Sequence, residues 1–206
     1  MWTGTEFEID ICFIRHGRTK SNDEHRYLSY TDEPLSIGGK TEICSLKESY
    51  PSVGKIFTST KIRTVETAEL IYGKTDITQI KEFDELNFGN FEGKTYDELK
   101  NDCDYSAWLN SGCTSKIPNG ESRDEFIKRQ LSGLDSCLLM TKKEKNIAVV
   151  AHGGTVMSIF SSFADGDYYD YMIKNGGFIS CHIKYYITGS ENVHVSHFSI
   201  TGRNDP

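Results

Sequence analysis

Short runs of apolar and β-branched residues alternate along the chain with segments whose apolar positions recur at helical spacing. The short runs predict strands over residues 9–14, 55–58, 77–80, 146–151, 178–186 and 193–199. The longer segments predict helices over residues 39–49, 61–72, 96–110, 123–140 and 155–163. Such alternation is typical of an α/β protein. We therefore expect a three-layer sandwich, in which helices cover both faces of a mostly parallel central sheet.

The fourth predicted helix has the clearest apolar stripe. Its members recur at helical spacing and are Phe126, Ile127, Leu131, Leu134 and Leu138. Residues at this spacing share one side of a helix, so the stripe is predicted to face the core. Its role is packing.

The first predicted strand ends in a group of residues suited to phosphate chemistry. Arg15, His16 and Gly17 follow the apolar run directly. A neutral imidazole nitrogen can attack phosphorus, and an adjacent guanidinium can neutralise the phosphate oxygens. Gly17 has no Cβ, so its N–H can closely approach an anion. These residues predict a phosphoryl-transfer site.

A second apolar run, residues 146–151, ends in the same way. His152 follows it and is followed in turn by Gly153 and Gly154. The carboxyl ends of neighbouring parallel strands meet at one crevice of an open α/β sheet. We therefore expect His16 and His152 to lie together, although a single buried histidine is more often structural.

The residues around His16 resemble a known motif. Residues 15–22 are similar to the R-H-G-x-T-x-x-N signature of the histidine phosphatase (phosphoglycerate mutase-like) superfamily. Residues 34–38, 58–68, 84–93 and 118–122 are similar, in order, to further motifs of that family. Together with His152 these blocks cover most of the chain. The resemblance implies the family's α/β fold and a phosphatase or mutase reaction.

Carried over to this sequence, the resemblance implies that His16 is the nucleophile and that Glu85 gives a proton to the leaving alcohol. It also implies a phosphate-binding set: Arg15, Gly17, Asn22, Arg63, His152 and Gly153. Among these, Arg15, Arg63 and His152 count as catalytic together with His16 and Glu85. Burial beside Leu86 and Phe88 is expected to raise the pKa of Glu85, which suits a group that donates and later accepts a proton.

Several of these residues also have plain structural interpretations. Arg63 can be a solvated arginine on a helix, and Glu85 an acidic residue before a turn. Asn22 equally suits a loop or a helix cap. For Arg18 and Arg26, substrate contact and a surface role remain equally open.

Residues 94–120 are predicted to form a helical and loop insertion over the active site, within a single domain of residues 1–206. The insertion is where the family is expected to select its leaving group. Tyr105, Trp108 and Leu109 can line a pocket there, or they can be the buried face of an amphipathic helix. The second interpretation is the more common one for such a pattern.

The resemblance includes both phosphatases and mutases. Phosphoglycerate mutases of the family carry a longer, arginine-bearing insertion and a basic tail, whereas residues 94–117 and 201–206 contain few basic residues. We therefore expect a phosphatase acting on small phosphomonoesters, similar to alpha-ribazole phosphatases or to broad-specificity members. The alternatives are phosphoglycerate mutase activity and an inactive protein that binds a phosphorylated ligand.

No metal or other cofactor is expected, because arginines and histidines can carry the positive charge that Mg²⁺ often supplies. His182, His194 and His197 lack the close spacing of a zinc motif and are interpreted as structural or surface residues. The net charge of −7 argues against nucleic acid as a partner. The expected partner is a small phosphorylated metabolite.

Residues 1–6 lack the basic and apolar features of a targeting signal, and no stretch of ~18 apolar residues is present to span a membrane. The six cysteines form no C-x-x-C pair, as is typical of free thiols in a reducing compartment. We expect a cytoplasmic protein without membrane contact. The oligomeric state is left open between monomer and homodimer.

Overall fold

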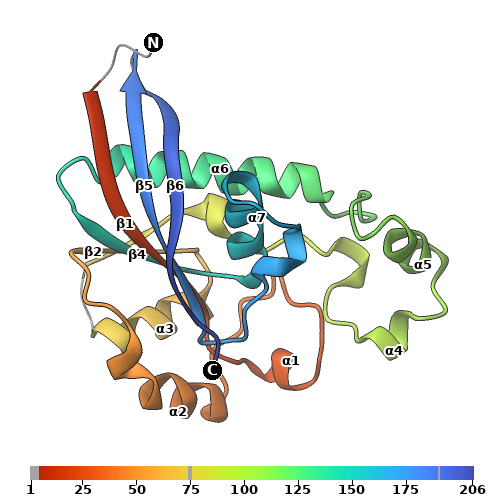
Figure 1. The fold of residues 1–206 in the computed structure, drawn as a ribbon. Helices are drawn as coiled ribbons and strands as arrows, with labels where there is room; N and C mark the ends of the chain where they lie inside the picture. Colours follow the sequence, from red (N-terminus) through yellow and green to blue (C-terminus); the bar gives the residue numbers. More distant parts are fainter. Residues whose placement is uncertain (1–4, 74–75, 190) are drawn as a thin grey trace.

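The computed structural model describes residues 5–73, 76–189 and 191–206. It shows a six-stranded mixed sheet with helices on both faces, which confirms the predicted three-layer arrangement (Figure 1). The order of strands across the sheet is β3-β2-β4-β1-β5-β6. The localisation prediction rests partly on residues 1–4, which lie outside the described residues.

The strands are β1 (Thr5–Arg15), β2 (Lys55–Thr58), β3 (Ile77–Gln79), β4 (Asn146–Ala151), β5 (Phe178–Thr188) and β6 (Asn192–Asn204). The α-helices are α1 (Lys20–Asp23), α2 (Ile37–Ser45), α3 (Ile62–Tyr72), α4 (Tyr96–Leu99), α5 (Cys103–Asn110), α6 (Arg123–Met140) and α7 (Gly153–Phe163). Short 3₁₀ turns are η1 (Lys47–Ser49), η2 (Lys81–Phe83), η3 (Gly89–Phe91) and η4 (Tyr168–Tyr171).

The parallel part of the sheet brings three strand ends to one edge. β4 runs parallel to β1 on one side and to β2 on the other. Arg15 at the end of β1 lies opposite Ala151 at the end of β4. Thr58 at the end of β2 lies opposite Val150 of β4. The residues that follow these three strand ends, and so share this edge, are His16, His152 and Ser59.

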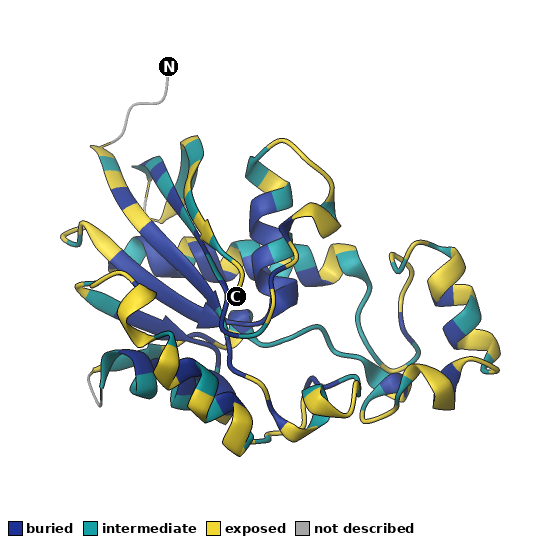
Figure 2. Cartoon of the chain, turned by 60° about the horizontal axis from the view of Figure 1, so that its bottom comes forward, coloured by how far each residue is buried: buried dark blue, intermediate teal, exposed yellow. Residues whose placement is uncertain are grey.

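Alternate residues of the central strands supply two separate cores. In β1, Ile11 and Phe13 pack with the apolar side chains of α6 and α7, whereas Cys12 and Ile14 pack with those of α2 and α3. The opposite direction of successive side chains in a strand explains this division. Figure 2 shows the strands as buried where the helices cover them. The edge that carries His16 is therefore held by buried elements on both faces.

One predicted helix is two helices in the structure. The expected segment over residues 96–110 breaks into α4 and α5, because Asp102 caps a new helix by accepting hydrogen bonds from the N–H groups of Asp104 and Tyr105. The segment predicted over residues 39–49 likewise ends early, with α2 followed by η1. Apolar spacing alone did not reveal either boundary.

The predicted core stripe of α6 is partly wrong. Phe126, Leu134 and Leu138 are buried, but Ile127 and Leu131 are only half-buried. The buried side of α6 also includes Gln130, Gly133 and Cys137. With 3.6 residues per turn, positions 127 and 131 fall beside that stripe, at the margin of the core.

Residues 94–120 extend to one side of the sheet, where α4 and α5 lie (Figure 1). Together with the preceding loop they form a small apolar cluster of their own: Phe91, Leu99, Tyr105, Trp108 and Ile117. The expectation of a buried helix face is confirmed for Tyr105 and Trp108 and wrong for Leu109, which is exposed. We call Phe91, Leu99, Tyr105, Trp108 and Ile117 the insertion cluster.

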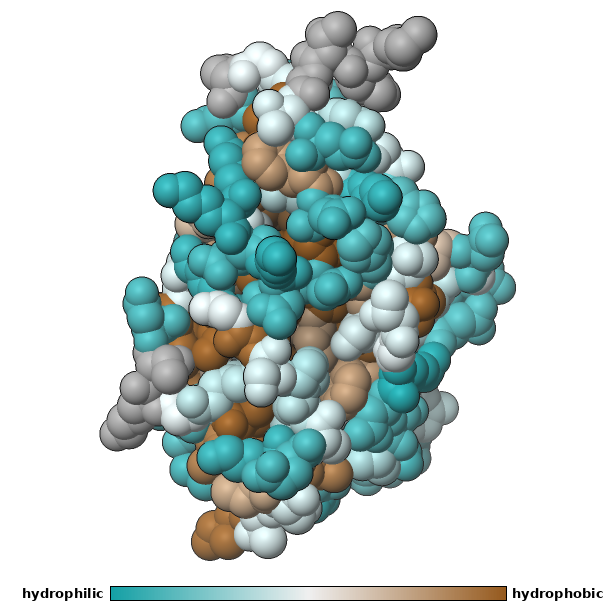
Figure 3. All heavy atoms as spheres, turned by 60° about the vertical axis from the view of Figure 1, so that its left-hand side comes forward, coloured by the Kyte–Doolittle hydropathy of each residue, from teal (hydrophilic) through white to brown (hydrophobic). Residues whose placement is uncertain are grey.

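Within the described residues, every helix is too short or too polar to cross a membrane. The face in Figure 3 is largely hydrophilic, and its apolar side chains show in separate areas between polar ones. All six cysteines are free thiols, and three of them, Cys12, Cys137 and Cys181, are buried.

Candidate active site

His16 is held at the carboxyl end of β1 by its own backbone and by its neighbours. Its N–H donates to the carbonyl oxygen of Ala151 at 2.9 Å, which continues the register of β1 with β4. Its ring Nδ1 lies 2.7 Å from the carbonyl oxygen of Gly17. Because only a protonated Nδ1 can donate to a carbonyl, the neutral ring carries its lone pair on Nε2. The imidazole is 4% exposed.

His152 lies beside His16, as the two strand ends predicted. The ring centroids are 5.1 Å apart, with an angle of 69° between the planes. Nε2 of His152 lies 2.9 Å from the hydroxyl oxygen of Ser59, the residue after β2. Nδ1 of His152 is buried and has no hydrogen-bond partner among the described residues.

Two buried guanidinium groups accompany the histidines. Arg15 donates through Nη1 to the carbonyl oxygen of Ile173 at 2.7 Å. Arg63 is fully buried on α3 and donates to the carbonyl oxygens of Thr31 and Ser29 at 3.0 and 3.1 Å. Nε of each arginine is buried and unpartnered among the described residues. The surface interpretation of Arg63 is therefore wrong.

Burial, together with the charges of the two arginines, keeps both imidazoles neutral. Burial, then the charge of Arg63, and then that of Arg15 hold the pKa of His16 well below its ordinary value. Burial is also the largest cause for His152, and its pKa is likewise well below 6.5. Near neutral pH both rings are therefore uncharged, and Nε2 of His16 is free to act as a nucleophile.

Glu85 lies in the loop between η2 and η3, against the start of α7. One carboxylate oxygen accepts a hydrogen bond from the N–H of Leu86 at 2.9 Å, and the backbone of Gly154 also donates to the carboxylate. Burial raises the pKa of Glu85, although Leu86, Arg15 and Arg63 act in the opposite direction. The raised pKa lets this carboxyl hold a proton at a higher pH than an exposed glutamate does.

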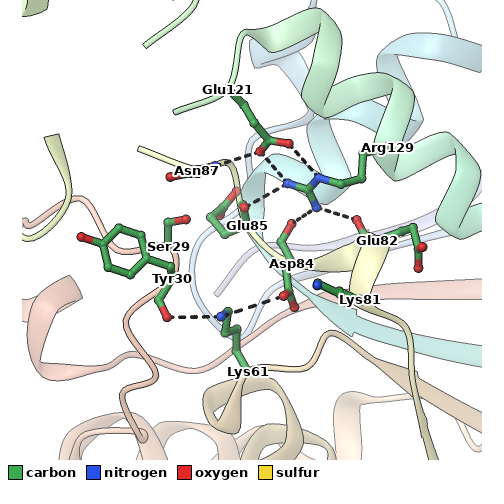
Figure 4. Close-up of a pocket in the computed structure, with 10 residues that line it drawn as sticks. All are labelled: Ser29, Tyr30, Lys61, Lys81, Glu82, Asp84, Glu85, Asn87, Glu121 and Arg129. Carbon is green, nitrogen blue, oxygen red and sulfur yellow. Dashed lines mark hydrogen bonds and ion pairs between the residues drawn. The ribbon is translucent and has the colours of Figure 1, made fainter. Parts of the chain in front are cut away.

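A clamp centred on Arg129 of α6 positions the loop that carries Glu85 (Figure 4). Arg129 donates through Nη1 to the carbonyl oxygens of Glu82 and Asp84, at 2.8 Å each, and through Nη2 to that of Glu85 at 3.2 Å. Its guanidinium also makes two hydrogen bonds to the carboxylate of Glu121, at 2.9 and 2.6 Å. The pair thus ties α6 and the end of the insertion to the Glu85 loop.

We expect Arg129→Met to destabilise the protein by about 2–4 kcal/mol, because it removes the cation that pairs with the Glu121 carboxylate and, with it, the five hydrogen bonds of the clamp. It should also slow any reaction that uses Glu85. Urea unfolding measures the first effect, with the exposed neighbour Lys128→Met as the matched control, expected within about 0.5 kcal/mol of wild type. Equal stability of the two variants would contradict the clamp.

The two glycines after His152 are not equivalent. A Cβ on Gly154 would lie 2.4 Å from a carboxylate oxygen of Glu85 and 2.8 Å from the ring of Phe126. A Cβ on Gly153 would meet only Arg15, at 3.4 Å or more, an ordinary contact. Close packing on the Glu85 carboxylate therefore requires glycine at position 154.

Gly154→Ala is expected to cost about 1–3 kcal/mol of stability and to displace the Glu85 carboxyl. Gly153→Ala, at the first position of α7, should be close to neutral in stability. Thermal unfolding of the two variants side by side tests this. If Gly153→Ala proved the more destabilising of the pair, the packing at Glu85 would be wrong.

The remaining predicted residues lie at the margin of this cluster. Asn22 forms a capping box with Thr19, as the cap interpretation expected, and its Oδ1 also lies 3.3 Å from the side-chain nitrogen of Asn175. It lines a hollow together with Arg15. Arg18 and Arg26 are engaged in surface ion pairs, Arg18 with Asp23 and Glu42 and Arg26 with Glu24 and Glu98. Both arginines also line the hollow that Asn22 shares with Arg15, so the geometry does not decide between substrate contact and a surface role.

Several residues that complete the site were not among the predicted site residues. Asn175 donates to the carbonyl oxygen of His16 at 3.0 Å, and Thr67 accepts the N–H of Gly17 at 3.0 Å. Ser59 and Thr67 lie inside a family-like block, so that block could have identified them. Asn175 and Arg129 stand outside any block, and only the folded chain brings them to the site.

Comparison with known proteins agrees with this geometry. The model of branch 1 of the histidine phosphatase superfamily matches residues 11–185. A Salmonella arizonae protein named "Probable phosphoglycerate mutase GpmB" is 31% identical over 153 residues, which is 70% of either chain. This chain therefore belongs to the histidine phosphatase superfamily.

Solved structures show the same fold. The phosphoglycerate mutase of Thermus thermophilus is 27% identical, with a TM-score of 0.66 over 91% of this chain and 97% of that one. The alpha-ribazole phosphatase of Shigella flexneri is 23% identical, with a TM-score of 0.73 over 91% of this chain and 94% of that one. The second likeness shows the fold alone.

Proposed function

We propose that this protein hydrolyses phosphomonoesters through a phosphohistidine intermediate on His16. One observation carries the proposal: three buried side-chain nitrogens around His16 have no hydrogen-bond partner among the described residues. These are Nε of Arg15, Nε of Arg63 and Nδ1 of His152. Buried polar groups without a partner are costly, and the phosphoryl oxygens of a substrate would supply the acceptors.

In the first step, Nε2 of His16 attacks phosphorus while the ester P–O bond breaks. The Gly17 carbonyl keeps the proton on Nδ1 and orients the ring, which gains positive charge as the P–N bond forms. Glu85 passes its proton to the departing alkoxide, so that the alcohol leaves neutral. Arg15 and Arg63 stabilise the negative charge on the transferring phosphoryl group.

In the second step, water attacks the phosphohistidine. Glu85, now ionised, accepts the water proton, the P–N bond breaks and inorganic phosphate is released. His16 returns to its neutral form and Glu85 to its protonated form. If the Ser59 hydroxyl donates to Nε2 of His152, the proton of that ring is on Nδ1. Nδ1 can then donate to the phosphate in both steps.

Hydrolysis is favoured over mutase chemistry by the charges of the insertion. Its three lysines are Lys94, Lys100 and Lys116. Lys100 pairs with Asp97 and Lys116 with Glu125, and within the described residues none of the three lines the pocket that contains Arg15 and Glu85. That pocket therefore receives no cation from the insertion, and Arg123, which follows the insertion and lines the pocket, is engaged by Gly112 and Tyr169. Mutase activity remains the second candidate, because relatives are named for it.

The test is release of inorganic phosphate from a panel of phosphomonoesters in the presence of EDTA, with conversion of 3- to 2-phosphoglycerate measured in parallel. We expect release that EDTA does not reduce, because the arginines supply the positive charge. Conversion without release would assign the protein to the mutases. Neither activity would favour a protein that binds a phosphorylated ligand without turnover.

A further inference from the structure

Glu85 lies where two hollows of the surface meet. One is polar, is shown in Figure 4, and is lined by charged groups such as Lys61, Lys81 and Arg129. The other has a volume of about 380 Å³. Its apolar lining includes Tyr27, Phe88, Trp108, Met157, Tyr168 and Tyr169. We call this second hollow the aromatic pocket.

The reacting groups determine which hollow receives the alcohol part of a substrate. The leaving oxygen must lie between the phosphorus and the proton donor, Glu85. The carbon group of the alcohol is bonded to that oxygen, so it must extend into a hollow that borders both the phosphate site and Glu85. Arg15, Gly153 and Gly154 line the aromatic pocket together with Glu85. Of these four residues, only Glu85 is among the described residues that line the polar hollow. The aromatic pocket is therefore on the leaving-group side.

Much of the wall of the aromatic pocket is built from aromatic side chains that contact one another. The hydroxyl of Tyr27 is engaged by that of Tyr105 at 2.8 Å, and the Tyr27 ring packs against Phe88 with centroids 4.8 Å apart. Tyr168 belongs to η4, which is far from Tyr27 and Phe88 in the sequence, and it lines the same pocket. Rings from several separate segments therefore enclose one cavity.

Arg123 braces this wall. Its guanidinium carbon lies 4.4 Å from the ring centroid of Tyr168 and 5.0 Å from that of Tyr169. Its Nη2 donates to the carbonyl oxygen of Gly112 at 2.6 Å and to the hydroxyl of Tyr169 at 2.8 Å. The cation is thus stacked on the tyrosines, which fixes their rings in place.

We propose that the natural substrate is a phosphomonoester whose alcohol carries a planar aromatic ring, and that this ring lies in the aromatic pocket while the phosphate lies at His16. The inference rests on the proposed function and adds the class of leaving group. A flat ring of the substrate can be buried in this pocket and can stack, offset, on its aromatic side chains. A three-carbon acid would fill little of the volume and would leave most of the aromatic lining without a contact.

The test compares two esters whose alcohols are similarly acidic, 2-naphthylmethyl phosphate and propyl phosphate. Because intrinsic reactivity is matched, the ratio of their kcat/KM values reports binding of the ring. We expect the naphthylmethyl ester to be favoured by on the order of 100-fold, as burial of one aromatic group allows.

Variants locate the effect. Phe88→Ala and Tyr168→Ala each remove one aromatic side chain from the lining of the aromatic pocket, and each should reduce the ratio by about tenfold. Tyr30→Ala is the matched control, because Tyr30 is an exposed aromatic residue that lines the polar hollow. It should leave the ratio unchanged. If a variant loses stability or overall activity, the kcat/KM values for both esters fall by the same factor. Their ratio is then unchanged.

The outcomes separate this inference from the proposed function. Equal turnover of the two esters by the wild-type protein would overturn the aromatic leaving group while leaving the phosphatase intact. A fall of the ratio in Tyr30→Ala, but not in Phe88→Ala or Tyr168→Ala, would overturn the choice of pocket. If phosphate were released neither from these two esters nor from any ester of the wider panel, the proposed phosphatase function would be wrong.

Discussion

His16→Ala is expected to reduce phosphate release by at least ~10⁴-fold, because the variant has no nitrogen that can form the covalent intermediate. The loss should appear in kcat and in kcat/KM alike. Stability should change far less than activity, since the ring contributes a single hydrogen bond, to the carbonyl oxygen of Gly17.

The intermediate itself provides the sharper measurement. Rapid quenching of the wild-type protein with a ³²P-labelled ester should trap one phosphoryl group per chain, bound as an acid-labile phosphoramidate on His16. His197→Ala serves as the control, because His197 is exposed on the edge strand β6. Trapping of a label by His16→Ala, or undiminished turnover, would show that another group or water attacks phosphorus directly.

Glu85→Gln is expected to lower kcat/KM for alkyl phosphates by about 10²–10⁴-fold, since the amide cannot give a proton to the leaving alkoxide. An activated ester such as 2,4-dinitrophenyl phosphate needs no such proton. With that ester the variant should release one equivalent of dinitrophenol in a burst and then turn over slowly, because the base for the attacking water is also missing. Stopped-flow absorbance measures both phases.

The same variant tests the acid–base assignment through pH. The pKa of Glu85 is raised above 4.5, and only the protonated carboxyl can donate, so wild-type kcat/KM should fall as pH rises through that pKa. At the acid end activity falls as His16 becomes protonated, and its pKa lies well below 6.5. Glu85→Gln should lose the fall at high pH and keep the one at low pH.

Glu82→Gln is the matched control, since Glu82 lies in η2, just before the loop that carries Glu85, and lines the polar hollow. It should keep the wild-type pH profile and the wild-type rate on alkyl esters. A variant at position 85 that retained both limbs of the profile would falsify the role of Glu85 as proton donor.

The sequence predicted the sheet well for a physical reason. Continuous apolar runs such as residues 147–151 are typical of strands covered on both faces, and β4 has the bounds that were predicted for it, 146–151. Helix boundaries were harder to predict. The side chain of Asp102 ends one helical segment and begins another, and apolar spacing does not record such a local hydrogen bond.

Some residues of the site could also be predicted from the sequence, and others could not. His16 and His152 follow strands, so their meeting could be predicted from the parallel sheet. Arg129 and Asn175 reach the site through contacts with backbone carbonyl oxygens, which any arginine or asparagine can make. Nothing in their local sequence sets them apart. Their roles depend on which loops the fold places beside them.

The insertion cluster, with its own apolar centre apart from the two cores of the sheet, has an evolutionary consequence. Trp108 belongs to this cluster and also to the aromatic pocket, whereas His16, His152 and Arg63 depend on the packing of the sheet. Substitutions that reshape the insertion therefore need not weaken the strands that hold the histidines. Under the proposed function, descendants of this chain can change the leaving group that they accept while the sheet keeps the two histidines together.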